Sequence, residues 1–219
     1  MTTNPFEALQ GYEHLVDKAD AFFQSMQETH GTCVKCVPHC SDCCHAVFGL
    51  FLVEAVHLKR HFDELNGDKI KEALWRCNDT ERALKRLEIK LKAHETDPQM
   101  GARIFATERI RCPLLDENAE CILYPYRPIT CRVYGTPTKI HGKPHVCGKS
   151  GFERGPSYPA FDLDGVYGDL FNLSKELLED FGEKDLDKAS LLISVCKAMR
   201  TPVDELINET FRDPFEGPS

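Results

Sequence analysis

Clustered cysteines constrain this chain more than any other feature of its sequence. Five of its 11 cysteines lie within twelve residues, and they are Cys33, Cys36, Cys40, Cys43 and Cys44. A second, more widely spaced set consists of Cys112, Cys121, Cys131 and Cys147. Thiolates are soft ligands that select zinc, copper(I) or iron–sulfur clusters over calcium or magnesium. We therefore predict a cysteine-ligated metal centre, and four thiolates from each set would be enough for two four-sulfur sites.

The cellular compartment decides between metal ligands and disulfides. The first residues lack the basic start and apolar run of a signal peptide. No apolar run approaches the roughly 20 residues that a membrane span needs. We therefore expect a cytoplasmic protein without a membrane partner. Reducing compartments favour metal-bound or redox-active thiols over a disulfide framework.

Charge is unevenly distributed along the chain. The formal net charge is −8. Residues 153–219 hold 15 acidic and 7 basic side chains, whereas residues 1–152 hold 20 of each. Neither part carries the excess positive charge that attracts a phosphate backbone. We expect no nucleic-acid partner, and a protein partner or substrate of unknown identity is left open.

Hydrophobic spacing predicts a mostly helical α+β fold. Apolar residues recur at helical intervals in residues 4–30, 53–65, 68–95, 163–182 and 186–199, and a short helix follows Pro202. Asn4 and Pro5 are typical of a helix start. Residues 110–115 and 121–124 have the pattern of two short strands joined by a polar turn.

From these elements we predict a small cysteine-rich metal-binding core with a short β-hairpin, wrapped by helices. Residues 1–152 would form the cysteine-cluster domain, including the N-terminal and long amphipathic helices. Residues 153–219 would form an acidic helical extension packed on it. Cys77 and Cys196 fall on apolar helix stripes, so we interpret them as buried structural cysteines.

Two histidines one helical turn apart, His57 and His61, form a second candidate pair. Such a pair can bind a metal ion. With Glu54 and Glu64 beside it, the same pattern is typical of a solvated polar helix face. We favour that interpretation and leave both histidines out of the ligand set.

The spacing of the cysteines bears on which metal is bound. A zinc ribbon pairs two distant Cys-x2-Cys knuckles, but the second set, Cys112, Cys121, Cys131 and Cys147, is spaced by 9, 10 and 16 residues and offers no partner knuckle to Cys33-x2-Cys36. Adjacent side chains such as Cys43 and Cys44 diverge on a helix or strand, so they do not easily bind one tetrahedral ion together. Residues 45–52 are apolar and aromatic and would exclude water. These features favour an iron–sulfur cluster over zinc.

Cys36, Cys40 and Cys43 also have the spacing of the three-cysteine motif of radical S-adenosylmethionine enzymes. That family usually has an aromatic residue just before the third cysteine, where this chain has Asp42. Its fold also needs alternating strands and helices. The helical pattern of this chain argues against membership.

A more extensive resemblance spans residues 36–147. The pattern is Cys36-x3-Cys40-x2-Cys43-Cys44, then Cys112-Pro-x-Leu, then Cys121-x2-Tyr-x2-Arg-Pro-x2-Cys131-Arg, and finally Cys147. It resembles the YkgJ-like cysteine-cluster family, whose members are described as zinc- or iron-chelating and to which flagellin lysine N-methylase is related. The resemblance implies that these eight cysteines are the metal ligands. Cys33, Cys77 and Cys196 lie outside its pattern.

Three functional hypotheses follow. The first is an iron–sulfur protein that serves electron transfer, cluster-dependent modification or assembly. The second is a zinc-stabilised interaction module without catalysis. The third is a methyltransferase related to flagellin lysine N-methylase, against which we note that the sequence has no Gly-x-Gly nucleotide loop. These patterns do not decide whether the chain is an enzyme.

Two arginines near Cys131 complete the predicted site. Four thiolates around a divalent ion or a cluster leave a negative charge that is costly to bury alone. Arg127 and Arg132 could offset it through charge-assisted hydrogen bonds. We expect Arg132, the nearer in sequence, to have the larger effect.

Overall fold

The structure is a computed structural model, and it describes residues 6–153 and 156–208. The α-helices are α1 (Phe6–His30), α2 (Leu52–Asp63), α3 (Gly67–Lys92), α4 (Pro98–Thr107), α5 (Ile129–Val133), α6 (Leu163–Asp180), α7 (Val195–Arg200) and α8 (Val203–Asn208). Short 3₁₀ helices are η1 (Cys43–His45), η2 (Tyr124–Tyr126) and η3 (Leu186–Ser190), and the strands are β1 (Thr138–Ile140), β2 (Lys143–His145) and β3 (Phe161–Asp162).

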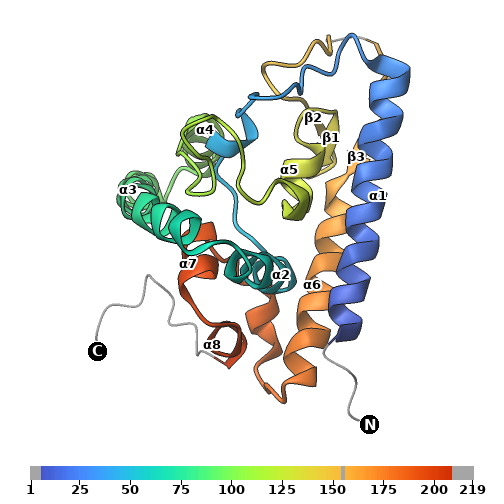
Figure 1. The fold of residues 1–219 in the computed structure, drawn as a ribbon. Coiled ribbons are helices and arrows are strands. Elements are labelled where there is room, and N and C mark those ends of the chain that lie inside the picture. The colour runs from blue at the N-terminus through green and yellow to red at the C-terminus, as the bar shows by residue number, and fades with distance from the viewer. Residues whose placement is uncertain (1–5, 154–155, 209–219) are drawn as a thin grey trace.

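Two long helices form one side of the molecule. α1 and α6 lie side by side and run in opposite directions (Figure 1). Gly11 of α1 lies against the Leu173 side chain, and a Cβ on that glycine would come within 2.5 Å of it. At the other end of the pair, the rings of Phe22 and Phe161 are 5.3 Å apart. This antiparallel helix pair supports the loops that carry the cysteines.

One large hydrophobic cluster lies between this pair and α3 on the opposite side of the molecule (Figure 1). α2 is its centre, and most of its residues are buried. α7 and α8 close the cluster from the C-terminal side. Cys77 of α3 and Cys196 of α7 are both 0% exposed, which confirms that they are core residues. Their thiols also hydrogen-bond to each other.

A small three-stranded sheet has the order β2-β1-β3. β1 pairs antiparallel with β2 and parallel with β3. The hairpin turns at His141 and Gly142, both at positive φ, and the Asp164 carboxylate accepts hydrogen bonds from their two backbone N–H groups at 2.7 and 2.9 Å. The predicted mostly helical α+β fold with a short hairpin is therefore confirmed.

The hairpin is not where the sequence pattern placed it. Residues 110–115 and 121–124 do not form strands, and only one isolated antiparallel bridge joins Leu115 to Cys121. The two segments do turn back on each other, since Ile122 N–H donates to the Leu114 carbonyl at 2.9 Å. The 3₁₀ helix that follows stops the pairing from extending further.

Helix prediction was accurate for the long elements and failed at two places. Residues 98–107 were not predicted to be helical but form α4, because Pro98 lies in its first turn and the Asp97 side chain caps the helix at the N–H of Met100. The predicted helix over residues 186–199 is interrupted because Ile193 pairs with Leu50 across an isolated bridge. The predicted start at Asn4 and Pro5 lies outside the described residues. Among the helices that the structure describes, none combines the length and the apolar character needed to cross a membrane.

Candidate metal centre

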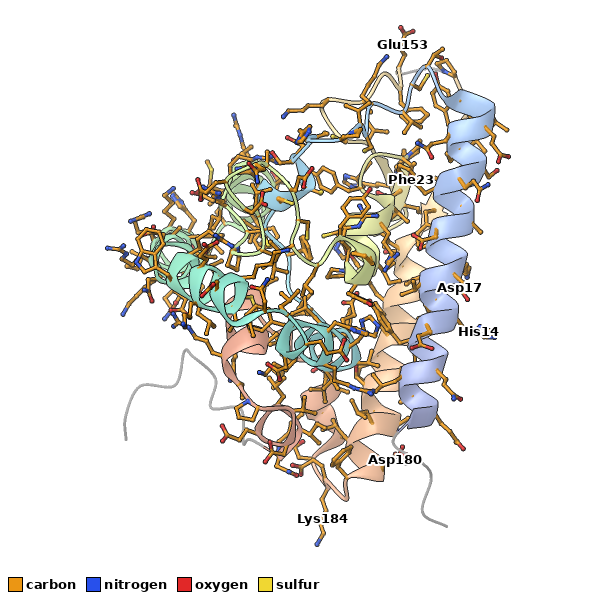
Figure 2. All side chains as sticks on the ribbon, in the orientation of Figure 1. His14, Asp17, Phe23, Glu153, Asp180 and Lys184 are labelled. Atoms are coloured by element: carbon orange, nitrogen blue, oxygen red, sulfur yellow. The ribbon has the colours of Figure 1, made fainter. Side chains whose placement is uncertain are left out.

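All eight predicted ligands line a single cavity of about 500 Å³. They come from the loop after α1, from η1, from the loops between α4 and α5, from α5 itself, and from the segment after β2: Cys36, Cys40, Cys43, Cys44, Cys112, Cys121, Cys131 and Cys147. Phe23 lies on the inner side of α1 (Figure 2) and contributes to the wall. Cys33 is not among the described residues that line the cavity. The fold thus brings two sets of cysteines that are distant in sequence to one place.

Backbone hydrogen bonds hold the two cysteine-bearing regions together. Cys112 N–H donates to the Cys44 carbonyl at 2.7 Å, and Ile110 N–H donates to the His45 carbonyl at 3.0 Å. Gly151 N–H donates to the Cys33 carbonyl at 2.8 Å. These bonds satisfy loop backbone groups that would otherwise be costly to bury, so the loops are fixed by more than their thiols.

One group of thiols gathers around Cys43. The thiols of Cys131 and Cys44 both donate hydrogen bonds to its sulfur, and these two bonds hold the pKa of Cys43 far below that of a free cysteine. Burial raises the pKa of Cys112 to about 12 and that of Cys121 to about 11. The expectation that adjacent cysteines diverge was wrong here, because the thiols of Cys43 and Cys44 meet.

A second group contains Cys36, Cys40 and Cys147. Burial, together with the charges of Cys40, Cys147 and Cys43, raises the pKa of Cys36 to about 11. The Cys147 thiol donates a hydrogen bond to the Asp42 carboxylate at 3.3 Å. Cys43 therefore neighbours both groups. Each group combines cysteines from both halves of the sequence pattern.

Gly135 leaves the space in which the Cys36 sulfur lies. A Cβ on this glycine would sit 2.0 Å from that sulfur, far inside van der Waals contact. Its φ is not in the left-handed region that favours glycine. Gly135 therefore matters because it lacks a side chain, which leaves room for the sulfur of Cys36, a residue of the cavity wall.

Asp42 links the second group to positive charge. Its carboxylate accepts a hydrogen bond from Arg109 at 2.6 Å and lies 3.4 Å from the Lys149 ammonium. Burial acts to raise the Asp42 pKa, but the hydrogen bond from Cys147 and these two cations together hold it below its usual value. Asp42 is therefore an ionised acceptor beside Cys147. It was not among the predicted site residues, since its position before Cys43 has no ligand signature.

Arg127 and Arg132 both line the cavity, and they differ in their partners. Arg132 is 5% exposed and is paired with Asp20 at 2.6 Å and with the Arg127 carbonyl at 2.8 Å. Arg127 stacks on the Tyr124 ring at 3.6 Å, and its charge lowers the pKa of Cys43. Its buried Nε has no hydrogen-bond partner among the described residues. Arg127 is thus the arginine with a free donor in the cavity wall.

The polar face predicted for residues 53–65 is wrong at two positions. Glu54 is buried and accepts backbone hydrogen bonds from Ile129 at 3.0 Å and Phe51 at 3.2 Å. Burial raises the pKa of Glu54 to about 7 despite those two bonds. His57 is also buried, against Tyr12 and His61, and burial lowers its pKa to about 4. Neither His57 nor His61 is among the described residues that line the cavity.

Glu54 has a positional role that its sequence context does not reveal. Its carboxylate joins the start of α2 to the start of α5, and α5 carries Cys131. An acidic residue in the first turn of a helix is common. Only the tertiary contact with Ile129 distinguishes Glu54 from a surface acid.

The donor set fits a cationic group that bridges several sulfurs. Crowded buried thiols cannot all ionise unless a cation compensates them, and metal binding supplies that compensation while releasing protons. Arg127, whose Nε has no hydrogen-bond partner among the described residues, lines the same cavity. Within residues 6–153 and 156–208, however, no three His, Cys, Asp or Glu side chains already converge tightly enough to hold one metal ion.

Comparison with known families agrees with this chemistry. A family model with the signature CxxCxxCC, described as a "putative zinc- or iron-chelating domain", matches residues 32–148. The chain belongs to this family. The match spans all eight cavity cysteines, so the predicted resemblance to a zinc- or iron-chelating cysteine-cluster family is confirmed, as is a cysteine-ligated metal-binding protein. No curated protein and no solved structure matches the chain.

Proposed function

We propose that this member of the zinc- or iron-chelating family binds iron–sulfur clusters through its eight cavity cysteines. One ligand group would be Cys44, Cys112, Cys121 and Cys131. The other would be Cys36, Cys40, Cys43 and Cys147. When bound, such a cluster supplies electron-transfer chemistry whose potential depends on nearby charge and hydrogen bonds.

The observation that carries the proposal is the cavity with its eight thiols. A structural zinc ion needs four ligands that converge at about 2.3 Å from one point. Eight cysteines line one space of about 500 Å³, which is twice the number of ligands that one zinc ion takes. Room and donors of this kind suit a polynuclear group better than one zinc ion.

The surrounding residues would offset the net negative charge that a metal–sulfur core carries together with its thiolate ligands. Arg127 offers a free N–H donor and a full positive charge. Asp42 accepts the thiol hydrogen of Cys147 at 3.3 Å in the metal-free chain, and the Arg109 and Lys149 cations beside it would offset the negative charge once Cys147 binds as a thiolate. Phe23 and Phe48 in the wall exclude water from the sulfurs. Hydrogen bonds, burial and local charge of this kind are the means by which proteins tune a metal–sulfur centre.

The deciding experiment is anaerobic purification followed by assays of iron, acid-labile sulfide and zinc, with a visible spectrum. We expect iron and sulfide in comparable amounts and broad visible absorption. Stoichiometric zinc without sulfide would overturn the iron–sulfur assignment and favour the zinc-stabilised interaction module.

Ligand variants test the assignment of the two groups. Cys131→Ser and Cys147→Ser each remove one proposed ligand, one from each group, and each should lower bound metal and the melting temperature because metal binding here contributes folding free energy. Cys33→Ser is the matched control, since Cys33 lies in the same loop as Cys36 but is not among the described residues that line the cavity. Full metal content in Cys131→Ser would show that Cys131 is not a ligand.

A further inference from the structure

A second, smaller cavity of about 260 Å³ lies on the other side of the Cys112 wall. Three arginines line it, together with the chain's single tryptophan: Arg76, Arg109, Arg111 and Trp75. Arg111 and Cys112 also line the metal cavity, so the two spaces share a wall. No part of the family's cysteine pattern accounts for this second cavity.

Arg76 is the residue that most needs explanation. It is 8% exposed, and its Nε donates to the Pro113 carbonyl at 2.8 Å. Its Nη1 is 3.8 Å from the Glu72 carboxylate, which is a long contact to an exposed acid. Its Nη2 is buried and has no hydrogen-bond partner among the described residues. A buried charged donor without an acceptor is costly, by more than the roughly 1–3 kcal/mol of a neutral one.

The other two arginines already have partners. Arg109 donates to the Asp42 carboxylate at 2.6 Å, and Arg111 donates to backbone carbonyls and to Glu117 at 3.1 Å. Arg109 and Arg111 add positive potential to the cavity, but their side chains already have hydrogen-bond partners. Asp79 and Glu117 also line the cavity, but Asp79 is paired with Arg82. The unsatisfied donor is therefore that of Arg76.

Trp75 gives the site an apolar surface. Its side chain is 69% exposed, which is unusual for a residue of this size. It lines the same cavity as Arg76, the next residue along α3. A ring beside a guanidinium group suits a small molecule with an anionic head and an apolar body.

We propose that this second cavity is an oxyanion-binding site, in which Arg76 Nη2 donates to a carboxylate or phosphate group and Trp75 contacts the rest of the ligand. The site goes beyond metal binding and does not depend on it. Because Cys112 and Arg111 belong to both cavity walls, an anion here would lie next to the metal centre.

Titration calorimetry and Trp75 fluorescence test the proposal on the full chain. Inorganic phosphate and sodium acetate are the two probes, and sodium chloride at matched ionic strength controls for screening. Because Trp75 is the only tryptophan, any change in its fluorescence reports on this cavity. We expect saturable binding of phosphate, acetate or both, with a fluorescence change that chloride does not reproduce. Equal responses to all three salts would overturn the proposal and leave a solvent-filled cavity.

Substitutions test whether the anion binds in this second cavity. Arg76→Met should weaken binding by roughly 10–100-fold, the equivalent of losing one charge-assisted hydrogen bond. Arg86→Met removes an exposed arginine from the same helix and should leave binding unchanged. Since Arg76→Met could disturb the Pro113 contact, Ala83→Glu provides a second variant that places an acid in the cavity wall and keeps Arg76. Unchanged affinity in Ala83→Glu would contradict the site.

Discussion

Replacing Gly135 with alanine tests the metal cavity by adding one methyl group. The new Cβ would lie 2.0 Å from the Cys36 sulfur, whereas ordinary van der Waals contact begins at 3.4 Å, so the two atoms must separate by roughly 1.4 Å. Metal–ligand distances tolerate changes of only about 0.2 Å. Cysteine has one side-chain torsion, so the easiest relief rotates the sulfur into another staggered position and away from its group.

The expected cost has two separable parts. Overpacking a buried contact typically costs about 1–3 kcal/mol, and for a chain of this size each kcal/mol lowers Tm by about 2–4 °C. That part should appear as a Tm difference between the metal-free parent and the metal-free variant. Loss of Cys36 as a ligand should further reduce bound iron and sulfide to roughly half, because only one of the two proposed groups contains it.

The measurement is iron and sulfide per chain after anaerobic purification, with thermal melts of the metal-loaded and metal-free proteins. Gly168→Ala is the matched control, because a Cβ there meets no heavy atom within 4 Å. Its position inside α6 should make it neutral or slightly stabilising. If Gly135→Ala kept the parent's iron and sulfide, Cys36 could not be a ligand in the position described.

Three further predictions follow from buried groups. The pKa of Glu54 is about 7 in the folded chain, against a usual value of 4.5. Between these two pH values the folded state therefore binds a proton that the unfolded state has lost. The stability that protonated Glu54 contributes is present below pH 4.5 and is lost as the pH rises through 7. The full loss is about 3 kcal/mol, of which about 2 kcal/mol falls between pH 5 and pH 7. Urea unfolding of the parent at those two pH values should show that difference, and Glu54→Gln should not. Parallel pH profiles of the parent and the variant would refute the reasoning. Arg127→Met should speed iron release to a chelator by about tenfold or more, and Arg86→Met should not; equal release rates would make Arg127 an ordinary wall residue. Cys77→Ala should keep all bound metal and cost only about 1 kcal/mol in urea unfolding, and loss of metal from it would place Cys77 in the ligand set.

The ligand candidates could be predicted from sequence because their evidence is local. Spacings such as Cys36-x3-Cys40-x2-Cys43-Cys44 lie within one short segment, and the motif around Cys131 lies within another. Both sets then line one cavity in the structure. How the thiols group could not be predicted, since it depends on which loop the Cys44 carbonyl pairs with after folding.

The fold predictions that were wrong depended on contacts between residues that are distant in sequence. Residues 186–199 have helical periodicity, but Ile193 forms a β-bridge with Leu50, which is distant in sequence. Glu54 and His57 look like a solvated face, yet Ile129 and Tyr12 cover them. Periodicity shows which residues share a helix face, and it does not show what packs over a polar one.

The pairing of Leu50 with Ile193 also determines when, during synthesis, the fold around the metal centre can be completed. Translation at roughly 5–20 residues per second needs on the order of 10 s to pass from the first cysteines to Ile193. Until then the ribosome has not yet made the residue that pairs with Leu50 or the core residues of α7 and α8. The nascent chain therefore presents its cavity cysteines to cellular oxidants and metals before the helical frame can close around them. A chain built in this order gains from receiving its metal early, and a synthesis pause before α7 would lengthen the interval of exposure.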